Sequence, residues 1–318
     1  MNETYINTIT QDDCRNVFPE LEDDSIDLLL SDIPYGIGLD DWDVLHNNTN
    51  SAFLGSSPAQ QGKTGFNKRR KPINGWSNAD RNIGKEYQQW CEEWASTAYK
   101  KLKPGASVFL FGARRTVHRV INALEDSGFL LKDVVAWKKQ SAHHRAQRVS
   151  IVLERRGLLD DAKAWEGWRL GNLAPMWEPI AWFMKPYTLG GTITDNILEH
   201  GLGAMNIDGC KVNGKRPTNI LEGALDRKEP RIHEAQKPVD LCEQLIGLTT
   251  YPGQLVIDPF AGSGTTAIAA RNTDRRFIAI EADKEMCEQA RTRLQKAAGE
   301  KPTRTGNEHQ IKESGTLL

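Results

Sequence analysis

The stretch "QLVIDPFAGSGTTAIAARN" (254–272) constrains the fold of this chain more than any other part of the sequence. A short apolar run leads into a glycine-rich loop, and a segment with helical composition follows the loop. The next segment, "RRFIAIEAD" (275–283), is again apolar and ends in an acid. A strand, a glycine loop, a helix and a second strand in this order form a parallel βαβ unit, so the chain must build a layered α/β sheet.

Strand-like and helix-like segments alternate along much of the chain. "SIDLLLSD" (25–32) is apolar on both faces, as expected for a strand inside a parallel sheet. Residues 86–102 have an apolar or small residue at every fourth position, which predicts a helix. We therefore predict an α/β fold with a doubly wound, mostly parallel sheet. Further strands are expected at 103–112 and 130–139, and further helices at 116–127 and 236–250.

The composition of the 318 residues excludes several classes of protein. Hydrophobic residues make up 39% and charged residues 26%, which is ordinary for a globular protein. The five cysteines are odd in number and widely spaced, so we expect neither a disulfide framework nor a metal site. No signal pattern and no apolar run of about 18 residues occurs, so we expect a cytoplasmic protein without a membrane partner. The formal net charge of -1 excludes a global positive field, but not a local basic surface.

The glycine loop "DPFAGSGTT" (258–266) indicates a nucleoside cofactor. Gly262 and Gly264 permit a tight turn and a close approach of the backbone to a ligand, and the helix start offers N–H groups to an anion. The next strand ends at Glu281, 17 residues after Gly264, where an acid ordinarily accepts hydrogen bonds from a ribose. The loop lacks the Gly-Lys-Ser/Thr of a phosphate-binding loop and the third glycine of a dinucleotide fingerprint.

"SDIPYG" (31–36) ends the first buried strand and is the second candidate site. The carboxylate of Asp32 is followed by Ile33, Pro34 and the aromatic ring of Tyr35. Pro34 fixes its own φ and biases the residue before it to an extended conformation. An acceptor, a stiffened backbone and an aromatic face together suit a flat, polar ligand.

Four motifs together resemble the S-adenosylmethionine-dependent DNA amino-methyltransferases of the beta class, the N-4/N-6 DNA methylase family. "DPFAGSGTT" looks like the cofactor loop of that family, and "SDIPYG" looks like its catalytic motif, usually Asp-Pro-Pro-Tyr. "DDCRNVFPELEDDSIDLLLSD" (12–32) and "HEAQKPVDLCEQLI" (233–246) are similar to the segments before the catalytic and the cofactor strands. The catalytic motif comes first, which is the beta-class order. The resemblance covers about 1–139 and 233–297 and implies a Rossmann-like class I methyltransferase fold.

The resemblance implies that the cofactor is S-adenosylmethionine and assigns residues to each part of it. The glycine loop would line the methionine part, and the acid at the end of the next strand would hold the ribose hydroxyls. The expected cofactor-binding residues are Phe260, Gly262, Ser263, Gly264 and Thr265 for the methionine part, Glu281 for the ribose, Asp13 for the adenine, Lys237 with Pro238 at the border of the pocket, and Asp258 at the start of the loop.

The expected catalytic residues are Asp32, Ile33, Pro34 and Tyr35. The exocyclic amine of adenine or cytosine is a poor nucleophile because its lone pair is delocalised into the ring. Acceptors on both amino protons favour a pyramidal nitrogen, and Asp32 and the Ile33 carbonyl can supply them. Tyr35 offers a face on which a base flipped out of the duplex can stack. Ile33 stands where the family has its first proline, but the backbone carbonyl is retained, so we expect activity to survive.

Two stretches are expected to bind double-stranded DNA. Residues 40–85 form a flap after the catalytic motif, and 140–232 occupy the place of the family's target-recognition region, as a separate module or large insertion. Within the latter, "WEPIAWFMKP" (177–186) is expected to pack in the core. Residues 298–318 are expected to form a flexible tail. The expected DNA-binding residues are Lys68, Arg69, Arg70, Lys71, His143, His144, Arg145 and Arg148.

The predicted function is site-specific methylation of adenine N6 in DNA, as part of a restriction-modification system. The nearest alternative is cytosine N4, which uses the same fold and cofactor. Asp32 favours adenine, because many cytosine enzymes have serine at that position. Methylation of RNA or protein agrees less well with the motif order and the large insert, and a catalytically silent DNA-binding relative is supported only by Ile33. The recognition sequence, a homodimer and a companion restriction enzyme are left open.

Overall fold

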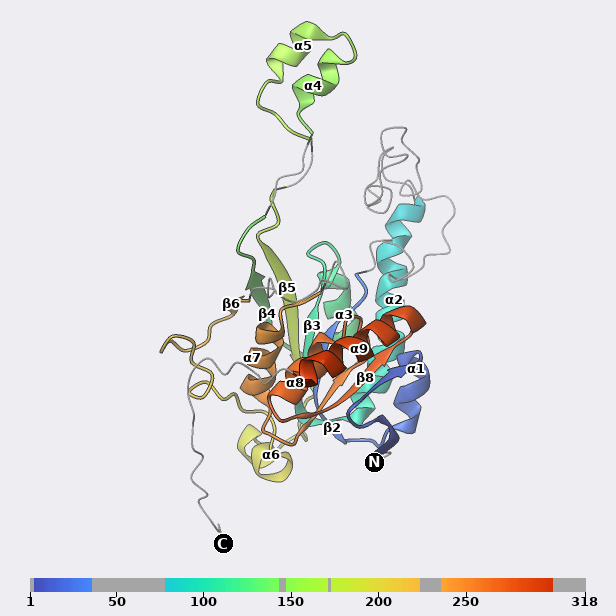
Figure 1. Cartoon of the computed structure of the whole chain (residues 1–318), viewed down its shortest axis with the longest axis vertical. Coiled ribbons are helices and arrows are strands. Elements are labelled where there is room, and N and C mark those ends of the chain that lie inside the picture. The colour runs from blue at the N-terminus through green and yellow to red at the C-terminus, as the bar shows by residue number, and fades with distance from the viewer. Residues whose placement is uncertain (1–2, 36–77, 143–146, 171–172, 224–235, 300–318) are drawn as a thin grey trace.

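The computed structural model describes residues 3–35, 78–142, 147–170, 173–223 and 236–299. Within these residues, eight strands form one sheet in the order β1-β8-β7-β2-β3-β5-β4-β6, and β5 runs antiparallel to both of its neighbours (Figure 1). The other strand pairs are parallel. The strands are β1 (Thr8–Gln11), β2 (Ile26–Asp32), β3 (Leu102–Phe111), β4 (Leu130–Lys138), β5 (Trp177–Met184), β6 (Ile220–Glu222), β7 (Leu255–Asp258) and β8 (Arg276–Glu281).

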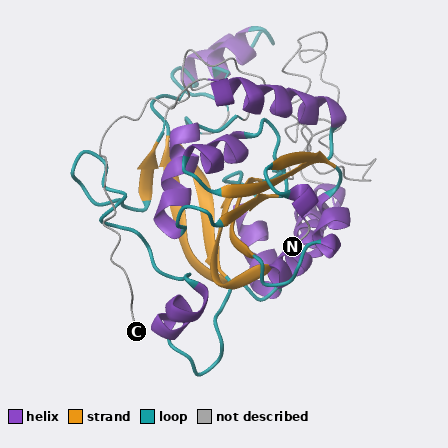
Figure 2. Ribbon diagram, turned by 60° about the horizontal axis from the view of Figure 1, so that its bottom comes forward, coloured by secondary structure: helices purple, strands orange, loops and turns teal. Residues whose placement is uncertain are grey.

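Helices cover both faces of the sheet (Figure 2). Along β2, Leu29 packs into one hydrophobic core, and Leu28 and Leu30 pack into the other, because successive side chains of a strand point to opposite faces. The first core contains α1 (Cys14–Val17), α2 (Asn78–Lys101) and α3 (Val117–Asp126), and the second contains α7 (Val239–Thr249), α8 (Thr265–Asn272) and α9 (Lys284–Gly299). Short 3-10 helices span Glu3–Tyr5 and Phe18–Glu20. The predicted doubly wound, mostly parallel α/β sheet is confirmed.

At the centre of the sheet, the order in which the chain adds strands changes direction. β2 and β7 are neighbours, with Leu28 opposite Val256. From β7 the chain passes through α8 to β8 on one side, whereas from β2 it continues to β3 on the other side. In open α/β sheets, ligands bind beyond the carboxyl ends of the strands at such a point. Asp32 and Asp258, the last residues of β2 and β7, both lie there.

Residues 140–232 contribute strands to the sheet, so the first of the two expectations, a separate module, is wrong. β5 and β6 belong to this stretch and pair with β3 and β4. "WEPIAWFMKP" packs in the core as predicted, and Ile180, Ala181 and Phe183 are buried. A strand buried on both faces has no alternating pattern, so the periodicity did not reveal it. The role of 140–232 in recognition stays a prediction.

The remaining parts of 140–232 lie at opposite ends of the molecule (Figure 1). Between β4 and β5, α4 (Val149–Glu154) and α5 (Leu159–Ala164) form a small helical hairpin that stands away from the sheet, beyond the carboxyl end of β4. After β5, α6 (Ile193–His200) lies at the other end, where β3 begins. Of these two helical parts, the hairpin is the one on the side of Asp32 and Asp258.

The expected flap is shorter than 40–85, because α2 already begins at Asn78. The rest of the flap and most of the expected tail, 300–318, lie outside the described residues. None of the described helices is both long enough and apolar enough to cross a membrane.

Candidate active site

Asp32 ends β2 and pairs with Lys237. The Lys237 Nζ lies 2.5 Å from Asp32 Oδ2, and the Asp32 side chain is 25% exposed. The other oxygen, Oδ1, is buried and accepts no hydrogen bond from the residues that the structure describes. Burial raises the pKa of Asp32, and the Lys237 ammonium opposes this shift. Buried polar atoms are nearly always paired, so an incompletely paired carboxylate at the carboxyl end of a central strand indicates a functional group.

Hydrogen bonds fix the backbone of the motif. The Tyr87 hydroxyl, on α2, donates to the Pro34 carbonyl at 2.6 Å, and the Thr116 hydroxyl donates to the Tyr35 carbonyl at 2.7 Å. Among the described residues, no hydrogen bond reaches the Ile33 carbonyl between them. The Ile33 side chain is 1% exposed and belongs to the core. The Ile33 side chain therefore fills the core, and none of the described residues occupies its backbone carbonyl.

Lys237 reaches the catalytic motif as well as the cofactor loop. Its side chain is 4% exposed, and its Nζ donates to Tyr35 Oη at 2.9 Å. Glu178 Oε2, on β5, lies 3.9 Å from the same nitrogen, and Glu178 also pairs with Lys139. The Lys237 backbone carbonyl lies 3.5 Å from the Thr265 hydroxyl of the cofactor loop. No sequence pattern indicated Glu178, because it lies in the stretch without periodicity.

Ser31 and Asp258 connect β2 with β7. The Ser31 hydroxyl donates to Asp258 Oδ1 at 2.6 Å, and the Phe260 N–H donates to the same oxygen at 3.1 Å. Asp258 is 3% exposed, and burial raises its pKa to about 7. Asp258 thus holds the start of the glycine loop against β2, rather than standing open to a ligand.

The glycine loop has the backbone conformation that only glycine adopts readily. Gly262 and Gly264 have φ values of 48° and 75°. A Cβ at Gly264 would lie 3.3 Å from the Ala290 Cβ, so this position is also tightly packed. The Gly262 N–H donates to Glu281 Oε2 at 2.7 Å, and the Asp283 N–H donates to Oε1 at 2.9 Å. Burial raises the pKa of Glu281.

Arg293, on α9, holds the loop from behind and was not predicted. One of its guanidinium nitrogens, Nη1, donates to the Ser263 carbonyl and to the Thr265 hydroxyl, each at 2.9 Å. Arg293 is 7% exposed. It follows Cys287 and Ala290 at helical spacing on the buried face of α9. An arginine in such an apolar row indicates a buried charge with a specific partner, and this is the signal that the sequence contained.

Phe260 packs against a helix beside the glycine loop, whereas Asp13 lies near the end of β8. The Phe260 ring packs against Trp90 and Trp94 of α2, with centroids 5.3 and 5.4 Å apart, so α2 forms a wall of the loop. Asp13 caps α1, and its carboxylate is paired with Arg15 at 2.7 Å, which holds its pKa below the ordinary value. The neighbouring Asp12 N–H donates to the Glu281 carbonyl, so Asp13 lies near the end of β8.

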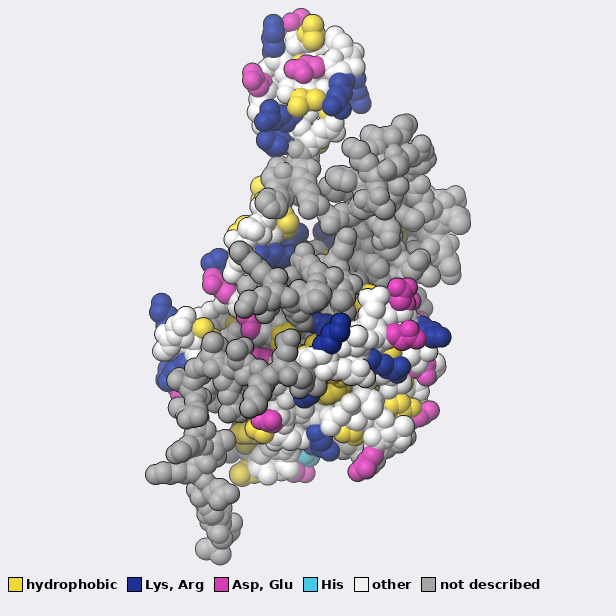
Figure 3. All heavy atoms as spheres, in the orientation of Figure 1, with side chains coloured by type: hydrophobic (Ala, Val, Ile, Leu, Met, Phe, Trp, Pro, Cys, Tyr) yellow, Lys and Arg dark blue, Asp and Glu magenta, His cyan; other side chains and the backbone are white. Residues whose placement is uncertain are grey.

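Most of the expected DNA-binding residues lie outside the described residues. This applies to Lys68, Arg69, Arg70, Lys71, His143, His144 and Arg145. Arg148 is described and is exposed at the start of α4. The hairpin carries further exposed basic residues, and Figure 3 shows Lys and Arg side chains on its visible face. These residues are Arg155, Arg156, Lys163 and Arg169.

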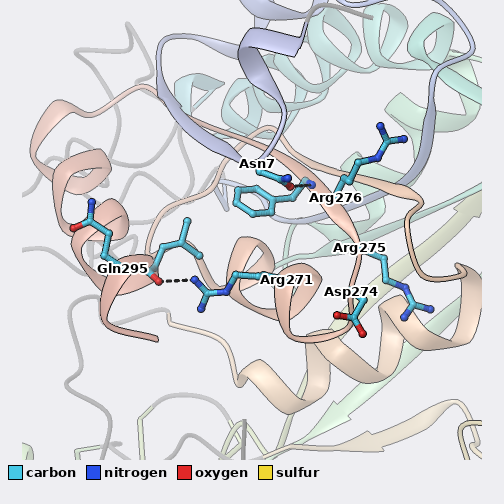
Figure 4. A pocket seen from close by; sticks show the side chains of 8 residues that line it. Asn7, Arg271, Asp274, Arg275, Arg276 and Gln295 are labelled. Carbon is cyan, nitrogen blue, oxygen red and sulfur yellow. Dashed lines mark hydrogen bonds between the residues drawn. The ribbon is translucent and has the colours of Figure 1, made fainter. Parts of the chain in front are cut away.

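A hollow of about 550 Å³ lies far from these groups, near the start of β8 (Figure 4). Arg271, Arg275 and Arg276 contribute to its lining. Each of them donates to a backbone carbonyl, for example Arg271 to Leu294 and Arg276 to Gly253. These arginines support local structure, and we assign no ligand to the hollow.

Comparison with known proteins identifies the class to which this fold and site belong, the DNA methylases that act on amino groups. The sequence profile of the N6/N4 DNA methylase family matches residues 26–292, so the chain belongs to this family. The Type II methyltransferase M.HindIII of Haemophilus influenzae is 47% identical over 267 residues, which are 82% of this chain and 86% of that protein. The Type II methyltransferase M2.DpnII of Streptococcus pneumoniae is 29% identical over 66% of this chain and 68% of its own length.

Solved structures agree in fold. The crystal structure of M1.HpyAVI with SAM has a TM-score of 0.52 and 20% identity, covering 90% of this chain and 98% of that chain. The cytosine-N4-specific PvuII DNA methyltransferase has a TM-score of 0.57 and 18% identity, covering 92% of each chain. As a member of this family, the chain is an S-adenosylmethionine-dependent DNA methyltransferase of the N6/N4 class.

The residues present fit this cofactor. A Cβ at Gly262 would meet nothing closer than 3.9 Å, so the loop has open space on that side. The first turn of α8 has no side-chain cap, which leaves N–H groups for a carboxylate. Glu281 is half-buried at the end of β8, where an acid can bind ribose hydroxyls.

Proposed function

We propose that this protein methylates the exocyclic N6 of adenine at specific sites in double-stranded DNA. The observation that carries the proposal is the partly exposed Asp32 carboxylate, which lies beside the cofactor loop through the Ser31–Asp258 bond. S-adenosylmethionine supplies an electrophilic methyl group when it is bound. An aspartate rather than a serine at the first motif position favours adenine over cytosine N4.

In this proposal, Asp32 and Ile33 activate the target amine together. The Asp32 carboxylate accepts one amino proton and the Ile33 carbonyl accepts the other, so the nitrogen lone pair is freed for in-line attack. Tyr35 stacks on the base, which has left the duplex. Tyr87 and Thr116 hold the adjoining carbonyls, so the two acceptors keep a constant separation.

For the cofactor, we propose the roles that the resemblance implies. The support is geometric, because Gly262, Glu281 and Asp13 gather at the carboxyl ends of β7, β8 and β1. The Asp13–Arg15 pair would face the adenine as a unit, and Arg293 would hold Ser263 and Thr265 in place near the carboxylate.

For DNA, we propose that the helical hairpin of α4 and α5 contacts the duplex together with the basic residues of the flap. The hairpin lies on the side of the molecule on which Asp32 lies, and it carries exposed arginines and two exposed tryptophans, Trp165 and Trp168. Arginine is suited to both phosphate and base-edge contacts. Because M.HindIII is a Type II methyltransferase, we also propose a companion restriction enzyme for this protein.

The test is nucleoside mass spectrometry. The purified protein is incubated with unmethylated duplex DNA and S-adenosylmethionine, and the digested DNA is searched for methylated nucleosides. N6-methyldeoxyadenosine is the expected product, and Asp32→Ala is the matched inactive control. N4-methyldeoxycytidine would replace the proposal with the sister activity. Cofactor binding without either product would indicate a silent relative.

A further inference from the structure

A buried lysine links the catalytic carboxylate to a second carboxylate. The Lys237 Nζ lies 2.5 Å from Asp32 Oδ2 and 3.9 Å from Glu178 Oε2. It also lies 5.4 Å from the centroid of the Tyr35 ring and 5.5 Å from that of Phe111, where a cation is attracted to the ring faces. A lysine that is 4% exposed is uncommon, and two of these contacts, to Asp32 and Tyr35, are to the candidate catalytic motif.

The geometry leaves room for Lys237 and a substrate on the same carboxylate. Each carboxylate oxygen has two lone pairs, so Asp32 Oδ2 can accept from the ammonium and from a second donor at once. Asp32 Oδ1 is buried and Lys237 holds Oδ2, while the side chain as a whole is 25% exposed. The ammonium thereby limits the rotation of the carboxylate plane.

The charges that face Asp32 come from several elements and act in different directions. Lys237 favours the ionised form of Asp32, whereas Glu178 opposes it. Asp258, at the end of β7, is a further acid near Asp32. Tyr35 and Arg114 follow the carboxyl ends of β2 and β3. Lys139 is paired with Glu178 and partly offsets its charge.

We propose that Lys237 is a positioning residue for the methyl transfer, which keeps Asp32 ionised and oriented toward the target amine, and that Glu178 tunes this pair. The proposal rests on the proposed function of Asp32 as the acceptor for that amine. Two opposite effects follow. Removing the charge of Lys237 moves the titration of Asp32 to higher pH, and removing that of Glu178 moves it to lower pH.

The first test needs no DNA. The protein is labelled with ¹³C at the aspartate carboxyl carbons, and the Asp32 signal is identified by its loss in Asp32→Asn. We expect this signal to titrate at higher pH in Lys237→Met than in the wild type, at nearly the wild-type pH in Lys237→Arg, and at lower pH in Glu178→Gln. An Asp32 titration that is the same in Lys237→Met and the wild type would overturn the proposal.

The second test measures methylation against pH for the same variants. With the cofactor at a saturating concentration, Lys237→Met should lower kcat at pH 7 by about tenfold or more, with the loss shrinking as the pH rises. Lys237→Arg should recover most of the rate. A loss of equal size at every pH would mean a structural role and would overturn the proposal. A wild type that yields no methylated nucleoside would instead overturn the proposed function, and the carboxyl titration would still decide whether Lys237 controls Asp32.

Discussion

At the scale of single residues, burial and neighbouring charges decide what each carboxyl group in the site can do. Asp32 and Asp258 are only one strand apart, yet their surroundings differ. Asp32 is partly exposed and paired with an ammonium, whereas Asp258 is buried and held by a hydroxyl and an N–H group. The first surroundings favour a carboxylate that interacts with substrate, and the second favour a structural acid.

Asp32→Asn should lower kcat by about 100-fold or more, because the neutral amide is a weaker acceptor for the target amine. The cofactor Kd should change by less than about threefold, since the glycine loop is untouched. Single-turnover methylation and calorimetric titration with the cofactor measure the two quantities. Near-normal turnover in this variant would refute the catalytic role of Asp32.

Asp258→Asn should change how stability depends on pH. Burial raises the pKa of Asp258 to about 7, above its value of about 3.9 in the unfolded chain. The folded state therefore binds a proton that the unfolded state has lost, and the contribution of Asp258 to stability falls as the pH rises from about 4 to about 7. In Asp258→Asn, the side chain at this position is uncharged in both the folded and the unfolded state. The variant therefore lacks this loss of stability with rising pH. Urea unfolding of both proteins at pH 5 and pH 8 measures the difference, and parallel pH dependences would contradict the prediction.

At the scale of elements, the cofactor site depends on helices that contribute no motif. α9 packs behind the glycine loop through Ala290 and Arg293, and α2 supplies Trp90 and Trp94 to the Phe260 ring. The loop is thus enclosed by helices from both faces of the sheet. Its conformation follows from this packing as well as from its own glycines.

Arg293→Met should weaken cofactor binding by about 10- to 100-fold, because charge-assisted hydrogen bonds to the loop are lost while the side-chain volume is kept. Lys296→Ala, an exposed change on the same helix, is the matched control and should bind normally. Both variants are compared by calorimetric titration with the cofactor, after their thermal unfolding has been checked. Equal affinity in Arg293→Met and the wild type would limit Arg293 to a role in packing.

At the scale of the whole molecule, the parallel strands bring the chemistry to one end. The carboxyl ends of β1, β2, β7 and β8 carry the candidate cofactor and catalytic residues, and the helical hairpin stands beyond the same end (Figure 1). α6 and the arginine-lined hollow lie toward the other end. DNA should therefore approach from the side of the hairpin.

Replacing Arg155 and Arg156 by alanine should weaken DNA binding and make its dependence on salt less steep. If each arginine neutralises one phosphate, the slope of log affinity against log salt falls in magnitude by about two. Cofactor affinity should not change, because the hairpin is remote from the glycine loop. The double variant Lys100→Ala/Lys296→Ala, which removes the same charge outside the hairpin and outside 140–232, is the control in a fluorescence-anisotropy titration. An unchanged salt slope would exclude the two arginines from the DNA contact.

The sequence by itself determined the α/β class, the glycine loop and the motif around Asp32. These features depend on periodicity and turn chemistry within about a dozen residues, so local patterns suffice to recognise them. The position of β5 in the sheet was not predicted, because a strand buried on both faces has no alternation of apolar and polar residues.

Only the tertiary structure decided which side chains surround the site. The bond between Ser31 and Asp258 joins residues 227 positions apart, and that between Lys237 and Asp32 joins residues 205 positions apart. Such pairs depend on the order of the strands in the sheet, which hydrophobic periodicity does not encode. The contacts of Glu178 with Lys237 and of Arg293 with the glycine loop follow from the positions of β5 and α9 in the fold.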